Sequence, residues 1–349
     1  MRARVPLVEC KPVASNFSGY KQAEDRVNRR NLLAAAALVL PQTLFARAEK
    51  SIREEDAKTL QAIRAVPAAV GIMLGEGFRT AHYLVLSEPP DTYKAKIGKF
   101  CEALLVDAMD VFSRAGLPVR PLERRLSVVI MENESFDRMA TKQGSPEANA
   151  YYDRALRTCF VPLNHVRDDR WQPIDWGHTL INLGHELIHQ FCYNTGLLNP
   201  EVGAPAFVSE GLAMLGEVSS WDQPRLLRQN NLIRLERMAE AEARGLTPLA
   251  DLFQDDGHFR GNHRTRENHL DSYSWAWLLV YTLLTEQDLR PRFCAYLKKI
   301  ATRTDKSHRV EDARAHFGDL DAFQTRLLRR SHRLRERPPS KYTSQRRTS

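Results

Sequence analysis

The stretch "NLGHELIHQF", residues 182–191, contains the pattern His-Glu-x-x-His at His185, Glu186 and His189. On a helix, two histidines four positions apart project from one face, one turn above the other. Two imidazoles in this arrangement can bind one Zn²⁺, and the glutamate beside the first histidine flanks the metal without binding it. The pattern is a hypothesis that the surrounding sequence has to support.

The flanking residues predict a helix over 176–195. Asp175 is a candidate N-cap and Gly196 a candidate C-terminal stop. The face opposite the histidines carries an apolar stripe formed by Leu180, Leu183, Leu187 and Phe191. As ordinary core residues, the two histidines would each need a hydrogen-bond partner inside an apolar helix. The sequence therefore favours a buried active-site helix.

A catalytic zinc site needs a third protein ligand and one open position. The metzincin extension requires glycine at 192 and histidine at 195, but the chain has Cys192 and Thr195, which excludes that class. The other known extension places a glutamate on a second helix, some twenty residues downstream. Glu210 in "GAPAFVSEGLAML" (203–215) follows His189 by 21 residues. A loop and a turn of helix at this distance can bring Glu210 back over the histidine pair.

These motifs resemble a known family. "GHELIHQF" followed by "PAFVSEGLA" is similar to the gluzincin-type zinc metallopeptidases of the peptidase MA clan. It is most similar to an uncharacterised exported bacterial branch whose second motif runs P-x-W-x-x-E-G-x-A. "SYSWAWLLVYTLL" (272–284) resembles the Ser-Trp helix of that branch, and "FGDLDAFQTRLLR" (317–329) its closing helix. The resemblance covers most of residues 75–330 and is strongest at the two metal motifs.

The resemblance implies an α+β, zincin-like fold with a mixed sheet over the active-site helix and a helical C-terminal subdomain. It implies Zn²⁺ held by His185, His189 and Glu210. It also implies that Glu186 acts as general base for metal-activated water that hydrolyses a peptide bond in a peptide or protein substrate. The different-class alternative is a non-catalytic, zinc-stabilised binding protein of the cell envelope.

Two departures from the family pattern affect the residues around the metal. Phe207 stands where the branch usually has tryptophan, and Met214 replaces the acidic residue that orients a histidine in thermolysin-like gluzincins. The partner of the metal-binding histidines must therefore come from elsewhere, with Glu217 or a backbone carbonyl as candidates.

The residue that stabilises the oxyanion is less clearly indicated. Its candidates are Tyr273, His269 and Tyr281. We favour Tyr273 as the second catalytic residue, and the alternative for this side chain is a packed core aromatic before Trp275. The polar, histidine-rich stretch 255–269 is expected to form a loop beside the cleft.

Hydrophobic patterns predict alternating strands and helices in the first half and mostly helices after residue 175. Strands are expected at 78–90, 125–131 and 151–163, the last either continuous or interrupted by a turn, and helices at 91–114, 134–142, 272–284, 289–300 and 320–330. The segment 156–161 is a candidate edge strand for pairing with extended substrate. The alternative is that it is an ordinary strand inside the sheet.

Charge is concentrated at the two ends of the chain. The formal charge is +8 overall, +5 in residues 1–48 and +8 in residues 325–349, so that 49–324 carries −5. An acidic body without a basic, aromatic-rich stripe argues against nucleic-acid binding. We therefore divide the chain into a leader (1–48), an N-terminal α/β part (49–175), a helical part with the active-site helix (176–330) and a basic disordered tail (331–349).

The leader contains "NRRNLLAAAALVLPQTLFARAEK" (28–50), which resembles a twin-arginine export signal. Its apolar run is shorter than the roughly 20 residues that span a bilayer, and Ala46-Arg47-Ala48 predicts cleavage near Glu49. The alternative is a surface amphipathic helix. We expect an exported protein, periplasmic or secreted, with no membrane segment after cleavage. Its four remaining cysteines would form two disulfides or stay as buried thiols.

Overall fold

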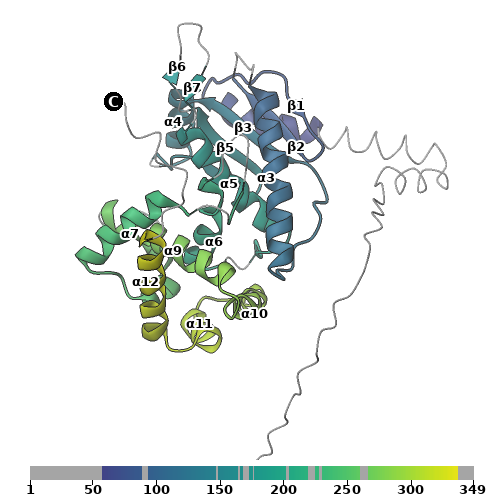
Figure 1. The fold of residues 1–349 in the computed structure, drawn as a ribbon. Helices are drawn as coiled ribbons and strands as arrows, with labels where there is room; N and C mark the ends of the chain where they lie inside the picture. The colour runs from purple at the N-terminus through teal and green to yellow at the C-terminus, as the bar shows by residue number, and fades with distance from the viewer. Residues whose placement is uncertain are drawn as a thin grey trace, which may run out of the picture. The chain divides into compact units, whose positions relative to one another are not determined.

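A mixed five-stranded sheet organises the N-terminal half of the computed structural model (Figure 1). Its order is β1 (Phe78–Arg79), β2 (Tyr83–Ser87), β3 (Leu126–Glu132), β5 (Thr158–Leu163) and β4 (Tyr151–Asp153). The three inner strands are parallel, and β1 and β4 are antiparallel edges. A separate ribbon pairs β6 (Val166–Arg167) with β7 (Pro173–Asp175). The structure describes residues 57–88, 93–146, 148–163, 166–167, 173–175, 177–201, 204–218, 225–227, 230–259 and 266–336.

Helices cover both faces of this sheet. Alternate strand residues point to opposite faces, so Val128 and Ile130 join one buried cluster while Val129 and Met131 join another. The first cluster contains the apolar faces of α3 (Lys94–Arg114) and α5 (Gly177–Asn194). The second contains α4 (Asn133–Lys142) and the helix formed by residues 57–68. Because both faces of these parallel strands are buried, their sequences are continuous apolar runs.

The rest of the described chain is helical. It comprises α6 (Ala206–Ala213), η1 (Gly216–Val218), α7 (Leu232–Arg244), α8 (Leu249–Gln254), η2 (Asp256–Phe259), α9 (Arg266–Thr285), α10 (Arg290–Ala301), α11 (Arg309–Phe317) and α12 (Leu320–Glu336). Helix α9 is central: Trp275 and Trp277 are buried, and α6 and α7 pack against it. The α+β class is therefore confirmed. Figure 1 shows the sheet with α3 and α4 above these helices and α5 between the two.

Both of the segments 78–90 and 151–163 are hairpins. The segment 78–90 turns at Thr80, whose backbone N–H donates to the Tyr83 carbonyl at 2.9 Å, so the prediction of a single strand there is wrong. The segment 151–163 turns after β4, where the Asp153 carboxylate accepts the Leu156 N–H at 2.9 Å, which confirms the option of a turn. The prediction of 156–161 as an edge strand is wrong and the alternative of an inner strand is confirmed, because β5 lies between β3 and β4.

The ends of the chain lie largely outside the described residues, including the leader 1–48 and the twin-arginine-like segment. Helix α12 continues past residue 331 to Glu336, with Leu334 buried. Within the described part of the chain, Cys101, Cys159, Cys192 and Cys294 are free thiols and the first three are buried. No described helix is both long enough and apolar enough to cross a bilayer.

Helix α5 contacts η1 at the backbone. A Cβ atom on Gly184 would lie 2.2 Å from the Gly216 carbonyl oxygen, and one on Gly216 would lie 2.1 Å from the Gly184 oxygen. Only residues without a side chain permit this approach. Each glycine immediately precedes an ionisable residue, His185 on α5 and Glu217 in η1, so the contact brings those two side chains together.

We expect Gly184→Ala to lower the free energy of unfolding by at least about 2 kcal/mol, because neither backbone can yield without moving its element. Chemical denaturation monitored by circular dichroism measures this change. Gly77→Ala is the matched control, since a Cβ there meets no atom closer than 3.4 Å and should have little effect. Equal stability of the two variants would contradict the packing argument.

Candidate metal centre

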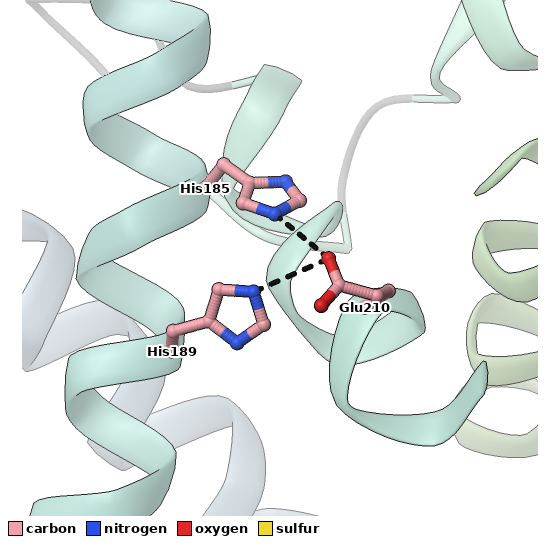
Figure 2. A group of neighbouring side chains, drawn as sticks. All are labelled: His185, His189 and Glu210. Atoms are coloured by element: carbon pink, nitrogen blue, oxygen red, sulfur yellow. Dashed lines mark hydrogen bonds and ion pairs between the residues drawn. The ribbon is translucent and has the colours of Figure 1, made fainter. Parts of the chain in front are cut away.

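His185, His189 and Glu210 meet between α5 and α6 (Figure 2). The Nε2 atoms of His185 and His189 lie 3.2 Å and 3.3 Å from the same Glu210 oxygen, Oε2. One donor atom from each residue lies within 4.8 Å of the other two, so the group could hold a metal ion. The sequence prediction that the loop returns Glu210 to the histidine pair is confirmed.

The lengths and ends of the two helices explain this meeting. Helix α5 ends at Asn194 and Gly196 adopts φ +74°, a left-handed conformation that stops the helix, as the sequence predicted. Helix α6 then begins at Ala206, whose N–H donates to the Asp256 carboxylate at 2.8 Å. A Cβ atom on Gly211 would lie 2.4 Å from the Ala276 carbonyl oxygen, so α6 packs tightly on α9 with Glu210 facing α5.

Glu217 orients His185 from the other side. Its Oε1 lies 3.2 Å from His185 Nδ1, which leaves Nε2 directed toward Glu210 and His189. Arg234 donates to both oxygens of Glu217, at 2.6 Å and 2.9 Å, and Asn231 donates to Oε2 at 2.8 Å. The carboxylate is buried yet fully hydrogen-bonded, which is the condition for keeping a charge in the interior. Glu217 thus supplies the acidic partner that orients a histidine, which Met214 cannot supply.

The carboxylates give this group a strong affinity for positive charge. Burial alone would lower the pKa of His185, but its contacts with Glu210 and Glu217 raise it to about 10. Burial opposes ionisation of Glu217, yet Arg234 and His185 lower its pKa to about 2. Burial likewise opposes ionisation of Glu210, but the two histidines hold its pKa well below the usual range. The negative charge that favours a proton on His185 also favours a metal cation at the same place.

Glu186 lies beside the metal group and is buried. The backbone N–H of Tyr152 in edge strand β4 favours the ionised form of Glu186. Burial raises the pKa of the Glu186 carboxyl, and the neighbouring imidazoles only partly offset this. A carboxylate with a raised pKa beside a cation site is suited to accepting a proton near neutral pH.

A cleft of about 380 Å³ opens in front of the metal group. Its lining includes Glu186, the three candidate ligands and Tyr273, whose ring centroid lies 6.4 Å from that of His185. Of the three candidates for oxyanion stabilisation, Tyr273 alone lines this cleft. Tyr281 instead donates to Asn230 at 2.9 Å, and His269 packs on the Tyr273 ring. Burial, together with the negative charges of Glu210 and Glu186, raises the pKa of Tyr273, so its hydroxyl keeps its proton.

Several cleft residues were missed from the sequence. Tyr193 follows His189 by four positions on α5 and shares its face, a signal that helical spacing alone could have revealed. Lys306 and Arg309 come from parts of the chain that are distant in sequence, and no local pattern identifies them. The prediction that stretch 255–269 lies beside the cleft is confirmed for Asp256 and Phe259 in η2.

The comparisons with known proteins add one match. The family model described as "Protein of unknown function (DUF1570)" matches residues 180–305. This region contains His185, His189, Glu210 and Glu217 together with Tyr273. A search of curated proteins found no match to the chain. The chain is thus similar to a family defined without a function, over the part that holds the metal group.

We expect Glu217→Gln to weaken metal binding about 10- to 100-fold, because the neutral amide loses the charged contact that orients His185. Competition between the protein and a chromophoric chelator for Zn²⁺ measures the affinity. The control is Glu240→Gln, which removes an exposed carboxylate from the same helix as Arg234. Unchanged affinity in the Glu217 variant would show that this residue does not support the site.

Metal binding at pH 7 should release about one proton. Because the pKa of His185 is raised from 6.5 to about 10, this side chain stays protonated in the metal-free protein at pH 7. Its contribution to metal-free stability is accordingly present below pH 6.5 and lost as the pH rises toward 10, while metal affinity increases over the same range. Isothermal titration calorimetry in two buffers of different ionisation enthalpy counts the proton. Equal heats in both buffers would contradict this expectation.

Proposed function

We propose that the protein is a zinc-dependent metallopeptidase of gluzincin type. The single observation that carries the proposal is the meeting of His185, His189 and Glu210 beside the buried Glu186. Two imidazole nitrogens and one carboxylate oxygen are a common donor set of catalytic zinc, which leaves one position open for substrate and water. Ligands bonded to zinc at about 2.0–2.1 Å in a tetrahedron lie roughly 3.3 Å apart, close to the two separations from Glu210.

Zinc bound by these three residues would act as a Lewis acid and make water acidic enough to attack at neutral pH. Glu186 would accept the proton of the attacking water and return it to the leaving amine. Tyr273, which keeps its proton and lines the same cleft, would donate a hydrogen bond to the oxyanion. Glu217 and Arg234 would hold His185 in the orientation needed for binding.

We also propose that the protein is exported, on the basis of the twin-arginine-like segment within 28–50. Its substrates would then be peptides or proteins of the periplasm or the surroundings of the cell. The zinc-stabilised binding protein remains the competing function, and the two differ in whether Glu186 is needed for more than packing.

The decisive variant is Glu186→Gln, which keeps the size of the side chain but cannot accept the proton. We expect it to bind zinc like the wild type and to lose at least about 100-fold in kcat against a quenched-fluorescence peptide library. Tyr273→Phe in the same assay removes only the hydroxyl, and zinc content is measured for both variants. If the wild type and Glu186→Gln hydrolyse peptides at the same rate, Glu186 is not the general base. A wild type that cleaves no peptide would favour the binding protein.

A further inference from the structure

Three cationic side chains line the cleft in front of the metal group: Arg154, Lys306 and Arg309. Asp256, which also lines the cleft, accepts from Arg309 at 2.7 Å and from Lys306 at 2.8 Å. These hydrogen bonds outweigh its burial and lower the pKa of Asp256 to about 2, so it stays ionised. A single carboxylate is thus shared by Arg309 and Lys306, and it does not pair with Arg154.

The three cations differ in how much of their bonding capacity the protein uses. Arg309 is buried, and its Nη2 atom has no hydrogen-bond partner among the described residues. Lys306 is more than half exposed. Arg154 is exposed and its guanidinium lies 5.3 Å from the centre of the Tyr193 ring; among the described residues it donates a single, long hydrogen bond of 3.4 Å to the Pro200 carbonyl. A structural ion-pair network would satisfy these donors, whereas a ligand site leaves some of them open.

Arg154 lies close in sequence to a residue that contacts the proposed general base. It directly follows edge strand β4, in the turn whose Arg157 carbonyl accepts from Gln190 of α5 at 2.7 Å. The backbone N–H of Tyr152, two residues before Arg154, stabilises the ionised form of Glu186. Two residues of extended chain span about 6.6 Å, and the long side chain of Arg154 adds to this reach. A group bound at Arg154 therefore lies at most a few substrate residues from the bond beside Glu186.

We propose that Arg154 and Lys306 form a subsite in this cleft that binds a carboxylate of the substrate. The inference rests on the proposed function, because it names the substrate class of the same cleft. Guanidinium and ammonium groups that line one cleft can provide charge-assisted hydrogen bonds to a carboxylate. The carboxylate is either the C-terminus of a peptide or an acidic side chain near the cleaved bond.

Binding to the full-length, zinc-loaded Glu186→Gln protein tests the subsite without turnover. The probes are fluorescein-labelled hexapeptides of alanine and leucine, measured by fluorescence anisotropy. One pair differs only in a C-terminal carboxylate or amide. The other pair, both amides, differs in a single internal glutamate or glutamine. We expect the acidic member of at least one pair to bind about tenfold more tightly than its neutral partner.

Arg154→Met combined with Lys306→Met should abolish this preference, and Arg154→Lys with Lys306 intact should retain most of it. Lys299→Met, which removes an exposed charge from α10 outside the cleft lining, is the matched control and should leave the preference unchanged. Both substituted residues are exposed, and circular dichroism checks that the variants fold.

The two peptide pairs distinguish the sources of the carboxylate, and either result supports the subsite. No preference in either pair would overturn the subsite. A preference that survives the double substitution would also overturn it, and would indicate that the carboxylate binds the zinc ion instead. If the wild type hydrolyses no peptide but the preference exists and depends on Arg154 and Lys306, the proposed peptidase function fails while the carboxylate subsite stands.

Discussion

The contact of two backbones at Gly184 and Gly216 is the constraint on which the candidate site depends. Because neither residue has a side chain, α5 and η1 approach closely enough for Glu217 to reach His185. Glu217 is held in turn by Arg234 and Asn231, so a continuous set of hydrogen bonds links the metal group to the start of α7. The orientation of a ligand thus depends on the packing of elements that are distant in sequence.

Glycine recurs beside the ionisable residues of the site. Gly184 precedes His185, Gly216 precedes Glu217 and Gly211 follows Glu210. In each case the missing Cβ atom would lie within 2.4 Å of a carbonyl oxygen on another element. The backbones of neighbouring elements therefore approach each other closely at the positions where the side chains of the site must meet. The ionisable residue next to each glycine is placed by this main-chain contact.

The sequence predicted the metal group well because its geometry follows from local periodicity. Helical spacing puts His185 and His189 on one face, and the distance to Glu210 fits a loop and a turn. The long apolar helices were also predictable from their patterns. A turn within 151–163 was one of two options, but its position was not predictable, because it depends on a hydrogen bond of the Asp153 side chain. Arg234 and Lys306 were not predictable for a different reason, since only tertiary packing brings Arg234 to Glu217 and Lys306 to the cleft.

The position of Glu186 beside Tyr152 has a consequence for the behaviour of the folded protein at high concentration. Strand β4 is an outer strand of the sheet, and outer strands expose main-chain donors that can pair with a second molecule and start aggregation. Here the strand is only three residues long, and the N–H of its middle residue interacts with the buried Glu186 carboxylate. A short strand whose central donor faces a carboxylate offers little main chain with which a second molecule can pair.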